Sequence, residues 1–106
     1  MTEPIRALLG EIKNGLERLY GPRLKGVYLF GSHARDEADS ESDVDLLVVL
    51  DTVGRYAAEI ERTSELVSAL SLDHRVTVSR VFVPEQAWLR ADTPFLLNAR
   101  EGAVPA

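Results

Sequence analysis

An acidic residue stands inside the most apolar segment of the chain. Residues 43–50 read Asp-Val-Asp-Leu-Leu-Val-Val-Leu, and such a short apolar run predicts a buried strand. Because side chains alternate along an extended chain, the two aspartates lie on the same face. That face carries Asp43, Asp45, Leu47 and Val49, and the opposite face carries Val44, Leu46 and Val48. An ionised Asp45 must be paired, bind a ligand or line an open cleft, because an isolated buried charge is costly.

Two further segments have the pattern of strands. Residues 26–30 are mostly apolar and end at the turn Gly31-Ser32, which predicts a buried strand before it. Residues 75–83 are rich in β-branched side chains and predict a third strand. Alternation gives this strand one face with Val76, Val78, Arg80 and Phe82, and another with Thr77, Ser79, Val81 and Val83. Periodicity leaves the direction of the strands open.

Helices are predicted before and after these strands. Apolar residues recur at helical spacing over residues 5–20, after a helix start at Thr2 to Pro4 and before Gly21-Pro22. Thr52 can cap a second long helix, whose apolar stripe is Tyr56, Ile60, Val67 and Leu70 and whose Glu59 faces solvent. Short helices open at Pro84-Glu85 and Thr93-Pro94. We therefore expect a single α/β (α+β) domain over residues 1–106, a small mixed sheet of three or more strands with helices packed on it.

Composition narrows the classes of function. The chain has 12 basic and 17 acidic side chains and a net charge of −5, which argues against broad electrostatic binding to nucleic acid or to an anionic membrane. It has no cysteine, so a disulfide framework and a thiolate zinc site are excluded. The longest strictly apolar run, residues 46–50, is far shorter than the ~20 residues that span a bilayer. The expectation is a cytoplasmic protein.

The chemistry of the chain concentrates in two short segments. Gly31-Ser32 predicts a turn leading into a short helix through Ala38, and free N–H groups at such a turn suit the phosphates of a nucleotide. A polar loop over residues 39–42 then leads to Asp43. Two carboxylates on one face of a strand, Asp43 and Asp45, suit Mg²⁺ held jointly with substrate phosphates. The two segments together predict a site for a nucleoside triphosphate and Mg²⁺.

This combination resembles the minimal nucleotidyltransferases of the DNA polymerase beta superfamily. The family pattern is Gly-Ser, about ten residues, then Asp-x-Asp, and the spacing here matches it, with Leu29-Phe30 before the Gly-Ser and Ala34-Arg35 after it. The resemblance covers about residues 24–90. It implies the nucleotidyltransferase fold, catalytic and metal-binding roles for Asp43 and Asp45 at one or two Mg²⁺ ions, and nucleotide binding by Gly31, Ser32, Arg35 and Ser42.

The resemblance also implies a reaction and a partner. Family members transfer a nucleoside monophosphate from a nucleoside triphosphate to a hydroxyl acceptor and release pyrophosphate. For this chain that implies transfer of AMP from ATP. Many members are encoded beside a HEPN-domain protein and serve as its antitoxin, which implies a protein partner of that kind; the sequence leaves an oligomer open.

One position departs from the family pattern. The family's third carboxylate comes from the strand after the long helix, and here that strand offers Thr77 and Ser79 on the matching face. Asp73 could replace the missing acid only if the strand begins earlier than residue 75. Two functions follow: an enzyme with weak activation of its acceptor, or an interaction module that neutralises a HEPN-type partner without turnover.

Two side chains near the motif have competing interpretations. Arg35 could contact a phosphate, or it could form a surface ion pair with Asp36 or Glu37. His33 is expected on the exposed side of the short helix rather than in a catalytic role.

Overall fold

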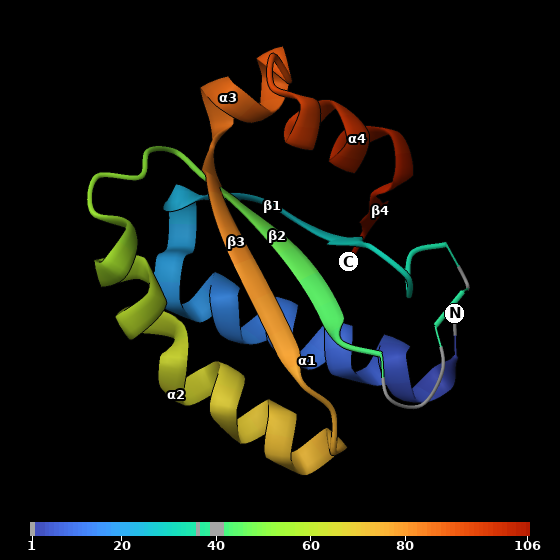
Figure 1. The fold of residues 1–106 in the computed structure, drawn as a ribbon. Helices are drawn as coiled ribbons and strands as arrows, with labels where there is room; N and C mark the ends of the chain where they lie inside the picture. The colour runs from blue at the N-terminus through green and yellow to red at the C-terminus, as the bar shows by residue number, and fades with distance from the viewer. Residues whose placement is uncertain (1, 36, 39–41) are drawn as a thin grey trace.

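A mixed four-stranded sheet forms the centre of the computed structural model, which describes residues 2–35, 37–38 and 42–106 (Figure 1). The strands are β1 (Leu24–Phe30), β2 (Val44–Leu50), β3 (Val78–Pro84) and β4 (Val104–Pro105). Their order is β3-β2-β1-β4; β1 is antiparallel to both of its neighbours, and β2 is parallel to β3. The mixed α/β fold predicted from the sequence is confirmed.

Helices cover both faces of the sheet. Two long helices, α1 (Glu3–Tyr20) and α2 (Tyr56–His74), lie against one face, and a 3-10 turn, η1 (Gly21–Arg23), joins α1 to β1. Two shorter helices, α3 (Glu85–Arg90) and α4 (Pro94–Gly102), pack on the other face, above α1 and α2 in Figure 1. No helix among the described residues is both long enough and apolar enough to span a bilayer.

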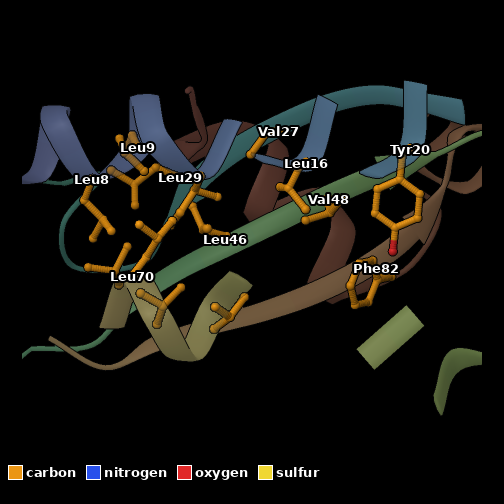
Figure 2. Packing of buried hydrophobic residues seen from close by; sticks show 14 of the residues in the cluster. Leu8, Leu9, Leu16, Tyr20, Val27, Leu29, Leu46, Val48, Leu70 and Phe82 are labelled. Atoms are coloured by element: carbon orange, nitrogen blue, oxygen red, sulfur yellow. The ribbon is translucent and has the colours of Figure 1, made fainter. Parts of the chain in front are cut away.

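The predicted alternation of β2 is confirmed. Val44, Leu46 and Val48 belong to the core under α1 and α2, whereas Leu47 and Val49 belong to the core under α3 and α4. Figure 2 shows Leu8, Leu9 and Leu16 of α1 and Leu70 of α2 turned toward Leu29, Leu46 and Val48 of the sheet. Because β2 lies between β1 and β3 and is covered on both faces, six of its seven residues are buried. The exception is Asp45.

The short helix expected from Ser32 to Ala38 is wrong. Residues 31–35 form a hydrogen-bonded turn, in which the N–H of Arg35 donates to the carbonyls of Gly31 (3.3 Å) and Ser32 (3.2 Å). The N–H of Glu37 donates back to Ser32 at 2.9 Å. A single turn of helix gains one hydrogen bond for several fixed residues, and this polar segment has no apolar stripe to compensate. The expected polar loop at 39–42 falls largely on residues outside the described ones.

The third predicted strand begins later than residue 75. Arg75 adopts a left-handed conformation (φ +55°), and its N–H and that of Val76 donate to the last carbonyls of α2, at Leu72 and Ser71. These two residues therefore close the helix and are not part of β3. The predicted faces of the strand hold nonetheless, because Val78 and Phe82 lie in the core under α1 and α2 and Val83 lies under α3 and α4.

The start of α2 and the exposure of Glu59 were also predicted wrongly. The Thr52 N–H donates to Asp51 Oδ1 (2.7 Å) and its carbonyl accepts from Arg23, so Thr52 lies in the connection after β2 and the helix begins only at Tyr56. Glu59 is buried, with 4% of its surface exposed, and accepts hydrogen bonds from Tyr20, Arg23 and Arg62. Its partners on α1 and η1 are far away in sequence, so helical periodicity could not reveal them.

Candidate functional site

The two halves of the sequence motif meet at one end of the β1–β2 pair. Phe30, the last residue of β1, lies opposite Asp45 in the antiparallel register. Gly31 follows Phe30 directly, so the glycine turn begins beside the Asp45 carboxylate. Asp43 precedes β2 by one residue and is exposed. The hairpin register thus brings together residues that are fourteen positions apart in sequence.

Position 31 requires glycine for two reasons, its backbone conformation and the side chain packed against it. Its φ is +77°, a conformation that side chains other than glycine rarely adopt. A Cβ built on Gly31 would lie 2.5 Å from Asp45 Oδ2, closer than carbon and oxygen can approach without movement. The absent side chain therefore leaves the space in which the Asp45 carboxylate sits against the turn.

The turn offers backbone donors beside this carboxylate. Within the described part of the chain, the N–H groups of Ser32, His33 and Ala34 donate to no backbone carbonyl, whereas those of Arg35 and Glu37 close the turn. Successive free N–H groups in a turn form a concave surface that favours anions. The N–H groups that the sequence led us to expect at the start of a helix are thus presented by a turn, and they suit phosphates in the same way.

The acid pair carries the electrostatic signature of a cation site. Burial raises the pKa of the Asp45 carboxyl above its ordinary value, and the neighbouring Asp43 charge raises it further, while His33 acts in the opposite direction. A carboxylate whose ionisation is opposed by a neighbouring negative charge is stabilised by a cation nearby. No cluster of three or more His, Cys, Asp or Glu able to hold a metal occurs among the described residues.

His33 lies in the turn and is half-buried, contrary to the expectation that it is exposed on a helix. Its Nε2 lies 3.1 Å from the carbonyl oxygen of Ser42. Because a carbonyl only accepts, the bond requires a proton on Nε2. This contact ties the glycine turn to the residue just before Asp43. The bond joins residues nine apart through a loop, which no periodic pattern reveals.

Strand β3, which pairs with β2, offers no third carboxylate in its described residues. Ser79 lies opposite Asp45 in the parallel β2–β3 register, so their side chains share a face, and Ser79 is exposed. Thr77 precedes β3, and its carbonyl accepts from the Val44 N–H at 2.9 Å. Asp73 lies within α2, so the earlier strand start that would make it the third acid is not found.

The remaining predicted residues border the same turn. The Arg35 guanidinium is exposed and forms an ion pair with Glu37, with 2.9 Å between Nε and Oε2. An exposed pair of this kind contributes little to stability and can exchange for another anion. Ser32 and Ser42 are both half-buried.

Comparisons with known proteins agree on one family. A family model described as "Nucleotidyltransferase domain" matches residues 9–91. Two proteins of Methanocaldococcus jannaschii are similar to the chain. "Putative protein adenylyltransferase MJ0604" is 32% identical over 76 residues, 72% of this chain and 70% of that protein. "Putative protein adenylyltransferase MJ0141" is 30% identical over 74 residues, 70% of this chain and 74% of that protein.

Solved structures share the fold. One described as "Structure of putative minimal nucleotidyltransferase" has a TM-score of 0.67 and 28% identity, and covers 98% of this chain and 94% of that one. Another, described as "Crystal structure of the toxin-antitoxin with AMP-PNP", has a TM-score of 0.61 and 25% identity, and covers 89% of this chain and 68% of that one.

Proposed function

This chain belongs to the nucleotidyltransferase domain family, and we propose that it transfers AMP from ATP to a hydroxyl group of a partner protein. The observation that carries the proposal is the packing of the Gly31 turn on Asp45. It sets free backbone N–H groups, which suit phosphates, directly beside a carboxylate that favours a cation.

The residues fit a magnesium ion shared with the substrate. Asp43 and Asp45 would supply two hard oxygen ligands, and phosphate oxygens would supply more. Bound Mg²⁺ would offset the charge of the phosphates and of the acid pair.

The chain's own residues bind and orient the donor in the proposed reaction. The N–H groups of the turn hold the phosphates. The acid pair, Asp43 and Asp45, lies beside the phosphates and orients them through the shared cation. An acceptor oxygen forms a bond to the α-phosphorus while the bond from that phosphorus to the bridging oxygen of the β-phosphate breaks, and pyrophosphate leaves. The hydroxyl proton passes to solvent, because among the described residues Ser79 stands where a carboxylate base would be expected.

A protein acceptor is supported by two relatives. The Methanocaldococcus jannaschii proteins both carry the name "Putative protein adenylyltransferase", and a structural neighbour is described as a toxin–antitoxin with AMP-PNP. We propose that the partner is a HEPN-type toxin and that the product of the neighbouring gene is the protein to test.

The direct test combines nucleotide binding and transfer. Wild-type protein is titrated calorimetrically with AMP-PNP in Mg²⁺, and is incubated with ATP labelled at the α-phosphate and the neighbouring gene product. Asp45→Asn and Asp43→Asn should each weaken AMP-PNP binding by at least tenfold, because each removes a charged oxygen ligand from the site.

The matched control is Asp73→Asn, which changes an exposed aspartate at the end of α2. It should bind and transfer like wild type. Unchanged affinity in both site variants would contradict the assignment, and loss of transfer in Asp73→Asn would show that Asp73 acts at the site after all.

A second function is favoured by Ser79. A hydroxyl opposite Asp45 is a poor metal ligand and a very weak base, which favours a module that binds nucleotide and neutralises its partner without turnover. The two functions separate in the transfer assay: tight partner binding and AMP-PNP binding with no labelled partner would establish the silent module.

A further inference from the structure

A small hollow adjoins the glycine turn on the side of α4. Its volume is about 170 Å³, and its walls include Phe30 and Gly31 from the end of β1, Arg35 from the turn, and Phe95 and Asn98 from α4. It is smaller than the ~300–1,000 Å³ of pockets that enclose drug-sized ligands, so it fits one ring system rather than a whole nucleotide.

The hollow shares Gly31 with the proposed phosphate site. A nucleotide whose phosphates lie on the turn can therefore place its base in the hollow. Larger hollows of about 300 Å³ beside the edge of β1 and about 410 Å³ between α1 and α2 include none of the described residues in the range 29–45. The position of the smaller hollow, rather than its size, relates it to the nucleotide.

One wall of the hollow is an aromatic ring open to solvent. Phe95 is 46% exposed, although a phenylalanine beside a core ordinarily buries most of its surface. Phe30 contacts it edge to face, with 5.8 Å between ring centroids and 84° between planes, which restrains the Phe95 ring. An exposed, restrained ring at the rim of a hollow is suited to the flat apolar surface of a nucleobase.

The other wall carries a free amide. Phe95 and Asn98 are three residues apart on α4, so they occupy one side of the helix. Asn98 is exposed, and its amide makes no hydrogen bond to another described residue. An amide presents one acceptor and a donor group side by side, which complements the N6 amino group and N7 of adenine. The corresponding edge of guanine offers two acceptors and matches an amide less well.

We propose that this hollow is the base subsite of the donor nucleotide, in which Phe95 contacts the base and Asn98 selects adenine over guanine. The proposal rests on the proposed function, because it takes the phosphates to lie on the Gly31 turn. It extends that function by assigning base preference to α4, outside the sequence motif.

The experiment measures the affinity of wild type and variants for ATP, GTP and inorganic tripolyphosphate in Mg²⁺. Asn98→Leu keeps the size of the side chain and removes the amide, so ATP binding should weaken about tenfold while GTP binding changes less. Phe95→Ala should weaken both nucleotides about tenfold. Tripolyphosphate binding should be unchanged in both variants, because it has no base.

Leu97→Ala is the matched control: this residue is 52% exposed on the same helix and does not line the hollow. It should bind all three ligands like wild type. Gly31→Val should lose all three, tripolyphosphate included.

The outcomes separate the subsite from the proposed function. If Asn98→Leu and Phe95→Ala bind ATP like wild type while Gly31→Val does not, the subsite is overturned and the nucleotide site stands. An equal loss of ATP and tripolyphosphate in the α4 variants, or a wild-type preference for GTP, also overturns the subsite. If wild type binds neither ATP nor tripolyphosphate, the proposed function fails and the subsite with it.

Discussion

At the scale of single residues, Gly31 and Asp45 determine each other. The glycine has φ +77° and no Cβ, and the carboxylate occupies the space that a Cβ would need. A residue with a Cβ could not replace Gly31 without moving the Asp45 carboxylate. The motif is therefore one steric unit built from two strands.

Replacing Gly31 tests this unit. Gly31→Ala should destabilise the protein by about 1–2 kcal/mol through its backbone conformation and should also displace the Asp45 carboxylate, so nucleotide affinity falls. Gly21→Ala is the control, because Gly21 also has positive φ (+55°) but has no atom within 4 Å of a built Cβ. Thermal melts and AMP-PNP titration of both variants check the prediction. A similar loss of affinity in Gly21→Ala would mean that instability alone explains the Gly31 result.

The position of Ser79 supports a gain-of-function prediction. Ser79→Asp puts a carboxylate on the face of Asp45 in the neighbouring strand, where it can accept the acceptor's proton. General-base help contributes ~10²–10⁴ in rate, so transfer of labelled AMP should rise measurably. Thr77→Asp is the comparison, because Thr77 lies before β3 rather than opposite Asp45. A rise only in Thr77→Asp would move the third-acid position to residue 77.

At the scale of elements, a buried carboxylate links the two long helices. Glu59 on α2 accepts from Tyr20 of α1 at 2.9 Å, from Arg23 of η1 at 3.2 Å and from Arg62 of α2 at 2.8 Å. Burial and Glu59 raise the pKa of Tyr20 to about 12. Burial alone would raise the pKa of Glu59, but the hydrogen bonds from Tyr20 and Arg23 and the two guanidinium charges lower it below its ordinary value.

The stability of the packing between α1 and α2 should therefore depend on pH. Because the pKa of Glu59 is lower in the folded state, its contribution to the free energy of unfolding is complete above pH 4.5 and disappears as the pH falls through the folded-state value. Glu59→Gln should cost about 1–3 kcal/mol at pH 7 and progressively less in acid. Urea unfolding between pH 3 and 7 measures this. Glu61→Gln, at an exposed position on α2, should show no such dependence; a constant deficit in Glu59→Gln would rule out linkage to this carboxylate.

The same elements show what a sequence can reveal. The faces of β2 and β3 were predictable because alternation is a local property, and Asp45 was identified because it interrupts an apolar run. The burial of Glu59 could not be predicted, because its partner Tyr20 is 39 residues away in the sequence. Two-residue β4 has no periodicity of its own, and it is held by pairing with Tyr28 and Leu29.

The site divides in a similar way. Gly31, Asp43 and Asp45 stand out by residue type and spacing, and the structure shows how closely Gly31 and Asp45 pack. The sequence did not identify Phe95 and Asn98 as site residues, because the pattern of α4 is that of an ordinary helix. Their position around the same hollow as Gly31 is visible only in the folded structure. His33 likewise gains significance only through its contact with the Ser42 carbonyl.

At the scale of the whole molecule, the net charge of −5 opposes the approach of an anionic ligand. The proposed binding of ATP therefore depends on the local donors of the turn and on a cation at the acid pair. The stability of the whole chain should report this coupling, since a ligand that binds only the folded state raises its free energy of unfolding.

Saturating nucleotide should accordingly raise the melting temperature. At 100 times the dissociation constant, the gain is about 2.7 kcal/mol, which corresponds to about 10–20 °C for a chain of this size. Removing Mg²⁺ with EDTA, or introducing Asp45→Asn, should abolish most of the rise. Thermal melts with and without ATP measure it, and an undiminished rise in EDTA would show that nucleotide binds without the cation.

The connection between β1 and β2 has a kinetic consequence. Gly31, Asp43 and Asp45 lie in one hairpin, so closing a short loop is enough to assemble them, and loop-closure entropy is small at that separation. Ser79 reaches Asp45 only through a parallel crossover that contains α2. In folding, the proposed donor half of the site (Gly31, Asp43 and Asp45) can form with the hairpin, whereas the proposed acceptor side at Ser79 forms only with the slower long-range pairing of β2 and β3. Under the proposed function, substitutions on β3 can thus change acceptor chemistry without disturbing the step that builds the nucleotide site.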